Sequence, residues 1–296
     1  MSKTALRQAY YSIGQTMDQA GLSYQSRHDY KQILRHSLQQ LHQAGFTLSS
    51  LQQLKQKHMD RLISVWKEEK LSAGTLKNRL SVWRLAMTTL GKHQVVKSND
   101  AYSIPSRRYT PEVSKGIHQV SFEGIHNPYV RMSLMLQQAF GLRREESIKF
   151  KPHQADKGNA IELQASWTKG GIQRIVPITT AWKRECLNQA KALVGQGMSL
   201  IPQALNYKAQ RVQYDNQVRL AGLKNPHGLR HAYAQQRYET LTHQLTKGHG
   251  WKSPIEGGPA RKSLNAFEKK VDEKARMIIS FELGHSRMAI VKNYIG

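Results

Sequence analysis

The sequence contains a single cysteine, Cys186, which excludes a disulfide framework and a cysteine-ligated metal site. It has no run of about 18 apolar residues, so no membrane-spanning helix is predicted. The first residues, MSKTALRQAYYSIGQ, lack the apolar stretch of a secretory signal. We therefore expect a cytoplasmic protein in which Cys186 is a small core residue.

Acidic residues are also scarce. The 296 residues include 20 Asp and Glu against 45 Lys and Arg, which gives a net charge of +25. Both parts of the chain share this excess, with 17 basic and 6 acidic residues in 1–108 and 28 and 14 in 109–296. Such a charge predicts a polyanionic partner, and nucleic acid is the commonest. An acidic membrane surface is the alternative, but no basic amphipathic anchor supports it.

The first hundred residues show the apolar periodicity of helices. One stripe ends at Gly45, a second runs from Leu51 to Trp66, and a third runs from Leu76 to Leu90 before Gly91. We predict a helical domain over residues 1–105. The polar faces between the stripes can contact DNA phosphates or simply face solvent. The candidate phosphate contacts on them are Lys77, Arg79 and Arg84.

Residues 97–116 lose this periodicity and gather Ser, Pro and basic residues, so we place an interdomain linker there. Within it, Arg107 and Arg108 are candidate contacts to a phosphate backbone. Residues 117–296 have a mixed pattern, with helices predicted near 128–140, 181–194, 207–221 and 226–241. Residues 160–166 and 172–178 indicate two strands, joined by a Lys-Gly-Gly turn into a β-hairpin.

Four segments of the second part carry side chains suited to phosphoryl transfer. Two arginines can hold phosphate oxygens, since a guanidinium binds them bidentately and stays charged. A lysine on a tight turn can protonate a leaving oxygen, histidines can move protons, and a tyrosine hydroxyl can attack phosphorus. The candidate residues are Arg143 and Glu146, Lys169 in the hairpin, His227, Arg230 and His231, and His285 with Tyr294 nine residues later.

Each of these residues also has a structural interpretation when it is taken alone. Arg143 can end a helix, Glu146 can be a surface carboxylate, and Lys169 can be an ordinary hairpin lysine. His227 can cap a helix, while the other two histidines can pack in a core. Their order and spacing together favour the catalytic interpretation.

Taken together, the segments resemble the tyrosine recombinase (phage integrase) family. The family's first box, GLRxxE, is matched at residues 141–146, and its second, HxLRH, at 227–231. Its third box, LGH followed by the nucleophile, is matched at 283–285 and Tyr294. The resemblance implies two domains, mainly α with a small antiparallel β-hairpin: a DNA core-binding domain over 1–105 and a catalytic domain over 117–296. Arg230 and His285 are 55 residues apart, which is long for the family, so residues 242–275 are predicted to be an insertion.

The resemblance also implies a mechanism. Tyr294 is the expected nucleophile on a scissile phosphate, and Arg143 and Arg230 are expected to hold its oxygens. Lys169 is expected to protonate the leaving oxygen. His227 and His285 are expected to assist the phosphate and the proton transfers, with Glu146 and His231 in support. No metal or cofactor is implied.

The implied partner is double-stranded DNA, bound by a tetramer that recombines two sites of a mobile element. Accessory DNA-bending or directionality proteins and a location on the bacterial nucleoid would fit that activity, and no membrane is involved. Two other functions remain open from the residues alone. A type IB topoisomerase uses a similar set of side chains, and a non-catalytic integrase relative would only bind DNA. RNA binding is less favoured, because no aromatic RNP-type run is present.

Overall fold

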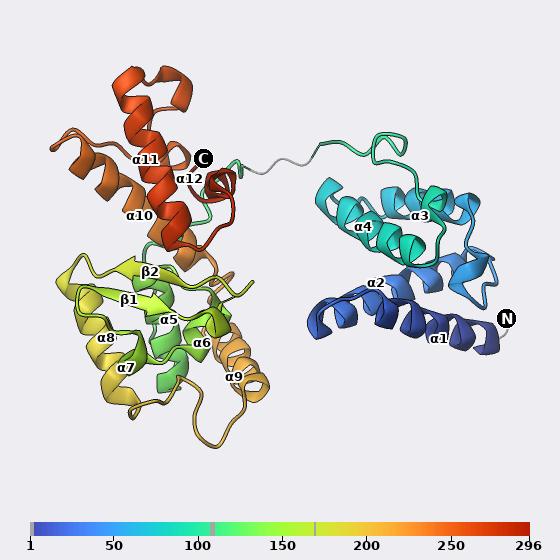
Figure 1. The fold of residues 1–296 in the computed structure, drawn as a ribbon, viewed down its shortest axis with the longest axis horizontal. Coiled ribbons are helices and arrows are strands. Elements are labelled where there is room, and N and C mark those ends of the chain that lie inside the picture. Colours follow the sequence, from blue (N-terminus) through green and yellow to red (C-terminus); the bar gives the residue numbers. More distant parts are fainter. Residues whose placement is uncertain (1–2, 107–109, 169) are drawn as a thin grey trace. The chain divides into compact units, whose positions relative to one another are not determined.

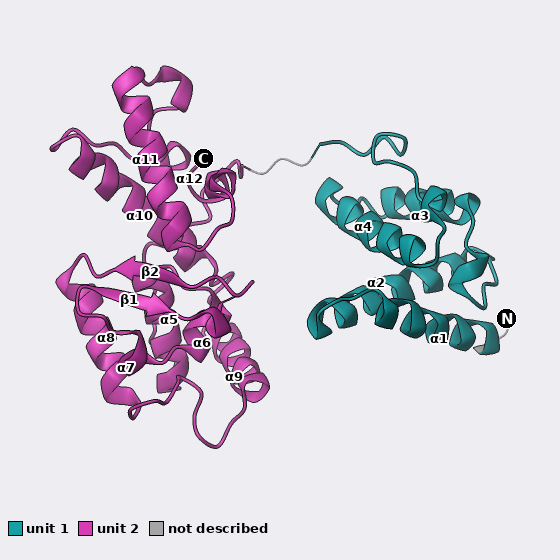
Figure 2. Ribbon diagram, viewed as in Figure 1, with its two compact units in different colours: residues 1–108 teal, residues 109–296 magenta. Residues whose placement is uncertain are grey.

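The computed structural model describes residues 3–106, 110–168 and 170–296, and it is mainly helical with one small sheet (Figure 1). The chain divides into two compact units, an N-terminal unit of residues 1–108 and a C-terminal unit of residues 109–296 (Figure 2). The predicted fold class is therefore confirmed. In the described ranges, no helix has the length and apolar character needed to cross a bilayer.

The N-terminal unit consists of four helices, α1 (Lys3–Gln19), α2 (Tyr24–Gln43), α3 (Gln56–Glu68) and α4 (Ala73–Thr89). Serine side chains cap α2 and α4 at their first turns, as expected for this residue type. The stripes that predicted α2 and α4 are confirmed. The second stripe is divided, since Leu51–Gln53 forms a 3₁₀ turn before α3 begins. Helix α1 was not predicted.

The core of this unit is apolar and aromatic. Trp66 of α3 and Trp83 of α4 are fully buried among leucines and methionines from all four helices. The indole Nε1 of Trp66 donates a hydrogen bond to Gln40 Oε1 at 2.8 Å, so a polar atom in this core has a partner.

The C-terminal unit places helices around a two-stranded sheet. The helices are α5 (Pro128–Phe140), α6 (Arg144–Lys149), α7 (Pro152–Ala155), α8 (Ala181–Leu193), α9 (Tyr207–Leu220), α10 (Gly228–Leu245), α11 (Ala266–Glu282) and α12 (Lys292–Ile295). Strands β1 (Ala160–Leu163) and β2 (Arg174–Pro177) pair antiparallel, with Leu163 opposite Arg174. The predicted hairpin is thus confirmed.

Helix α10 is the central element of this unit. It packs against α5, α11 and α12 (Figure 1), and 12 of its 18 residues are buried. Helix α5 begins at Pro128 after an Asn127 cap and ends at Gly141 in the left-handed conformation. A Cβ at Gly141 would come within 2.5 Å of the Tyr233 ring, so both the backbone angle and the packing require glycine there.

The segment 242–275, which the sequence predicts to be an insertion, includes parts of two long helices. Its first residues finish α10 and its last residues begin α11. Between them, residues 246–265 connect the helices through two 3₁₀ turns, Pro254–Glu256 and Arg261–Ser263. Asn265 and Glu268 form a capping box that starts α11. That this segment is an insertion remains a prediction.

Candidate active site

Tyr294 lies in α12 and is held by α10. Its hydroxyl accepts a hydrogen bond from Arg230 Nε at 3.4 Å, and its backbone carbonyl accepts one from Gln235 Nε2 at 2.8 Å. The side chain is largely buried, with 7% of the residue exposed. Two residues of one helix therefore fix both the ring and the backbone of the tyrosine.

Arg230 is completely buried at the start of α10. Its Nη1 donates to the carbonyl of Gly141 and its Nη2 to the carbonyl of Leu283, while Nη2 also lies 3.3 Å from His285 Nε2. Burial lowers the pKa of the guanidinium to about 10, so it still carries its charge at neutral pH. The arginine thus joins the first and third sequence boxes and adds a positive charge beside the tyrosine hydroxyl.

Three histidines surround the Tyr294 ring. Its centroid lies 4.5 Å from that of His231, 5.3 Å from that of His285 and 6.0 Å from that of His227. His227 stands directly before α10, and His231 is the next helical turn along the same helix. His285 follows Gly284, which ends α11 with a positive φ. Residues from the second and third boxes are therefore brought together around one ring.

The histidines are held in the neutral form. Burial and the charges of Arg230 and Arg143 lower the pKa of His285 to about 3. Burial, with His227 and Lys115 nearby, lowers the pKa of His231 to about 4. Burial, followed by the charges of Arg230 and Arg143, also lowers the pKa of His227 to about 4. Neutral imidazoles can accept protons.

Arg143 precedes α6 and is oriented by Glu146. Its Nη1 forms an ion pair with Glu146 Oε1 at 2.7 Å, and its backbone N–H donates to Oε2 at 2.7 Å. Arg143 keeps 24% of its side chain exposed, whereas Glu146 has none exposed. The carboxylate is therefore positioned to orient an arginine that can still reach a ligand.

Arg174 is a residue of the site that the sequence analysis did not identify. From β2 it forms a bidentate ion pair with Glu146, at 3.0 and 2.6 Å, and its Nε donates to the carbonyl of Glu282 at 2.8 Å. Although burial alone raises the pKa of Glu146, the hydrogen bonds and charge of Arg174, with Arg230 and Arg143, lower it to about 2. In the structure Arg174 and Val176 share the buried face of the strand, and the sequence alone does not distinguish that face from the other.

A second buried ion pair lies behind the third box. Arg237 of α10 binds Glu282 through Nε and Nη2, with Nη2–Oε1 at 2.8 Å, and the Tyr233 hydroxyl donates to Glu282 Oε2 at 2.7 Å. Because Glu282 directly precedes Leu283 and Gly284, these bonds fix the backbone whose carbonyl accepts from Arg230. Arg237 and Glu282 were not identified from the sequence either.

The other candidate residues lie in the N-terminal unit or outside the described residues. Lys169, Arg107 and Arg108 lie outside the residues that the structure describes. In the N-terminal unit, Arg79 lies over the Trp66 ring, with its guanidinium carbon 5.2 Å from the ring centroid. Arg84 Nη2 donates to the Lys97 carbonyl and to Asn99 Oδ1, at 2.7 and 2.9 Å. That these residues and Lys77 contact DNA remains a prediction.

The cluster contains the side chains that phosphoryl transfer through a protein nucleophile requires. The Tyr294 hydroxyl stands beside Arg230 and three imidazoles that can accept or pass protons, and Arg143 Nη2 reaches the Gly284 carbonyl of the third box at 3.5 Å. Over the described part of the chain, no three His, Cys, Asp or Glu side chains gather in a way that would hold a metal ion.

Two family models match the chain, "Phage integrase, N-terminal" over residues 9–96 and "Integrase" over residues 111–236. No curated protein matches the sequence. Among solved structures, the integrase of the Tn1549 transposon in complex with circular intermediate DNA is similar at 13% identity and a TM-score of 0.54, covering 100% of this chain and 96% of that one. XerH site-specific recombinase in its post-cleavage complex with palindromic difH is similar at 16% identity and a TM-score of 0.53, covering 92% and 76%.

The structural likeness concerns the fold, and the family models account for most of both units. Those models, the order of the three boxes and the two-domain fold agree with one another. The chain belongs to the phage integrase family of tyrosine recombinases, enzymes that cut and rejoin DNA at specific sites.

Proposed function

We propose that this protein is the integrase of a mobile genetic element, in which Tyr294 attacks the scissile phosphate. The attack forms a 3′-phosphotyrosine and releases a 5′-hydroxyl. The observation that carries this proposal is the 3.4 Å hydrogen bond from Arg230 Nε to the Tyr294 hydroxyl, inside a ring of three histidines. A charged guanidinium favours the phenolate that must form during attack.

The two arginines of the boxes would stabilise the phosphate as charge develops on its non-bridging oxygens. Arg230 is preorganised by two backbone carbonyls, and Arg143 by Glu146. Donors that are fixed before the reaction need no reorganisation in the transition state. Arg174 and Glu146 would act through Arg143 as positioning residues.

The Tyr294 proton would pass to a neutral histidine, and His231, with the nearest ring and an unpartnered Nδ1 among the described residues, is suited to accept it. His227 and His285 would support the phosphate. Lys169 would protonate the departing 5′-oxygen.

The partner strand's 5′-hydroxyl would then attack the phosphotyrosine, so that the bond energy is conserved and no nucleotide is consumed. We infer that four protomers on two duplexes exchange strands through a Holliday junction. The transposon integrase bound to circular intermediate DNA supports a mobile-element role by analogy of fold. Such a protein would work on nucleoid DNA in a bacterial cytoplasm, with accessory bending or directionality proteins as further partners.

The test is to trap the covalent adduct. The protein is expressed in bacteria, cells are lysed in SDS, and protein-linked DNA is captured and sequenced. We expect adducts at a defined sequence for the wild type and none for Tyr294→Phe. The matched control is Tyr24→Phe, which removes a hydroxyl from an exposed tyrosine of the N-terminal unit and should leave the adduct unchanged.

Adduct formation by Tyr294→Phe would overturn the assignment of the nucleophile. Adducts scattered over the genome, with supercoil relaxation and no joining of two sites, would instead favour a topoisomerase. Absence of adduct from the wild type, with DNA binding retained, would favour a protein that only binds DNA.

A further inference from the structure

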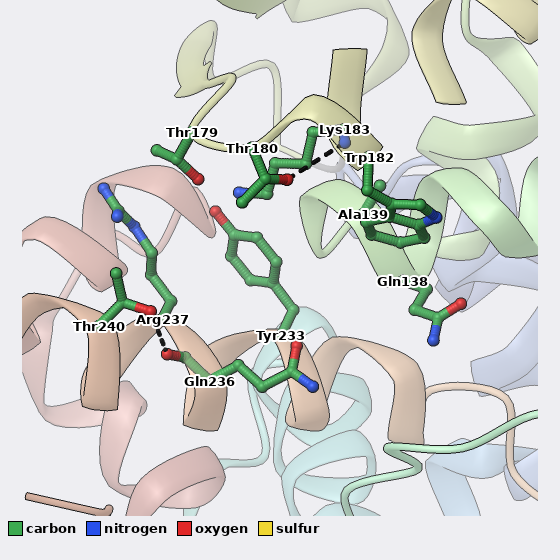
Figure 3. Close-up of a pocket in the computed structure, with 10 residues that line it drawn as sticks. All are labelled: Gln138, Ala139, Thr179, Thr180, Trp182, Lys183, Tyr233, Gln236, Arg237 and Thr240. Carbon is green, nitrogen blue, oxygen red and sulfur yellow. Dashed lines mark hydrogen bonds between the residues drawn. The ribbon is translucent and has the colours of Figure 1, made fainter. Parts of the chain in front are cut away.

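A small pocket lies in the C-terminal unit at the end of α5, the start of α8 and the middle of α10 (Figure 3). Its volume is about 130 Å³, enough for one small group and not for a nucleoside. The side chains that matter here are Thr179, Lys183, Tyr233 and Arg237. In Figure 3, the Lys183 ammonium and the Thr179 and Tyr233 hydroxyls face a common space.

Lys183 is buried without an oxygen partner. Only 7% of the residue is exposed, and Nζ has no hydrogen bond in the described part of the chain. Nζ is not one of the fully buried unpartnered atoms, so it is accessible from solvent. Its nearest described contacts are aromatic faces, with Nζ 4.9 Å from the Tyr233 ring centroid and 5.9 Å from that of Phe140. Buried lysines are rare unless they are paired. An ammonium group in this setting therefore lacks an acceptor that a ligand can supply.

Arg237 supplies a second unpartnered donor. It is 9% exposed, and its Nη1 is buried with no hydrogen-bond partner in the described part of the chain. Its other donors are used by Glu282, which also accepts from the Tyr233 hydroxyl. The Glu282 carboxylate is therefore already occupied. Two cations against one anion leave an excess of one positive charge.

We propose that this pocket binds a phosphate group. An oxyanion there would accept from Lys183 Nζ, the Thr179 hydroxyl can add a second donor, and the buried Arg237 guanidinium would add its charge. It would balance the excess charge, and charge-assisted bonds of this kind are the strong ones. The group can belong to free inorganic phosphate or to a DNA backbone, and the same contacts would serve both.

The pocket is separate from the reacting centre. Arg237 follows Arg230 by seven residues on α10, which corresponds to about 10 Å along the helix axis. The two sites are nevertheless coupled through Glu282, since that residue binds Arg237 and directly precedes the Leu283 carbonyl that accepts from Arg230. A phosphate beside Arg237 would thus influence the position of the third box through Glu282, without contacting the scissile phosphate.

Protonation supports the same conclusion. Burial, followed by the charge of Arg237, lowers the pKa of Lys183 to about 8, while Glu282 opposes the shift. The ionisable groups that face Lys183 are Arg237, Glu282 and Tyr233. A bound anion would raise the pKa of Lys183, so binding near pH 8.5 should take up protons. Calorimetry in buffers of different ionisation enthalpy measures this uptake.

The test compares the full chain with Lys183→Met and with the exposed Lys269→Met as the matched control. Thermal melting and calorimetry are run with inorganic phosphate at constant ionic strength, adjusted with chloride. We expect phosphate to stabilise the wild type and Lys269→Met. The affinity of Lys183→Met for phosphate should be lower by about tenfold or more. Lys183→Gln is a second replacement in case methionine alters the packing.

DNA titrations distinguish the two sources of phosphate. If the group is a backbone phosphate, Lys183→Met should lower the salt slope of duplex binding by about one unit. If it is free phosphate, the slope stays unchanged while the calorimetric signal is lost. Equal phosphate binding by all variants, or none by the wild type together with an unchanged slope, would overturn the proposal.

Discussion

The two units of this chain differ in whether charged side chains are buried. In the described part of the N-terminal unit no Lys, Arg, Asp or Glu is buried, and its core is apolar. In the C-terminal unit the buried charged residues are Glu146, Arg174, Lys183, Arg230, Arg237, Asp272 and Glu282. Burying a charge costs free energy of folding unless the charge is paired. The folding of the second unit therefore depends on its buried ion pairs, and that of the first does not.

That difference follows from what each unit does. A basic helical surface can meet DNA through solvated side chains, and this needs no internal charge. A phosphoryl-transfer site needs cations that do not move, and burial with fixed partners provides that rigidity. We therefore expect substitutions of charge to damage catalysis and stability in the C-terminal unit, and mainly affinity in the N-terminal unit.

The largest expected effect is that of Arg230→Ala. Loss of the guanidinium removes the donor to Tyr294 and leaves two backbone carbonyls unpaired. We expect cleavage of a suicide substrate to slow by at least about a thousandfold. Duplex affinity should stay within a few fold, because many other basic residues share the phosphate contacts. Arg230→Lys, which keeps the charge, should recover part of the rate. Complete loss of DNA binding by a folded Arg230→Ala protein would contradict this separation.

The next effect is on stability. Glu146→Gln would leave Arg174 buried with an uncompensated charge, and breaking such a pair costs about 3–5 kcal/mol. The matched change in the N-terminal unit is Asp18→Asn, which breaks an exposed pair with Lys31 and should produce no measurable change. Urea unfolding measures both. Because Arg174→Met removes the stranded charge, the double variant should be more stable than Glu146→Gln, and failure to recover would show that packing dominates.

Acid should affect the C-terminal unit first. Glu146 has a folded pKa of about 2, so its contribution is present above its ordinary value of 4.5 and is lost as pH falls toward 2. His231 and His285 have folded pKa values of about 4 and 3, so the unfolded chain takes up protons first and stability falls as pH drops below 6.5. Each shifted group changes stability by up to about 1.4 kcal/mol per pH unit in its window.

Hydrogen exchange resolved by peptide measures this difference. Between pH 6.5 and 4.5, protection of α10 and α11 should decrease more than protection of α3 and α4. Equal loss in both units would mean that the buried histidines do not set the acid limit.

The sequence was sufficient for the fold class and for the residues that lie around Tyr294. The second box begins a helix, so the spacing of His227, Arg230 and His231 places them on adjacent turns. The meeting of that helix with His285 and Tyr294 was implied only by resemblance to a family. Local periodicity contains no information on which helices pack together.

The supporting ion pairs were missed for a related reason. Arg174 occurs in the run Gln-Arg-Ile-Val, where an arginine beside apolar residues looks like an outward-facing strand residue. The structure reverses this, with Ile175 61% exposed and Arg174 buried. Its partners, Glu146 and the Glu282 carbonyl, are 28 and 108 positions away along the chain. Only the tertiary fold brings them within hydrogen-bonding distance.

The smallest expected effect concerns Lys77 in the N-terminal unit. Of the three described DNA-contact candidates, Arg79 packs on Trp66 and Arg84 binds Lys97 and Asn99, whereas Lys77 has no such contact among the described residues. Its charge is therefore free for phosphate. Lys77→Gln should lower the salt slope of duplex binding by about one unit and leave stability unchanged. The matched control is Lys31→Gln, since Lys31 already pairs with Asp18 at 2.8 Å and has less charge to offer. Equal slopes for the two variants would show that an exposed ion pair does not withhold a lysine from DNA, and that the N-terminal unit uses its charge without regard to local partners.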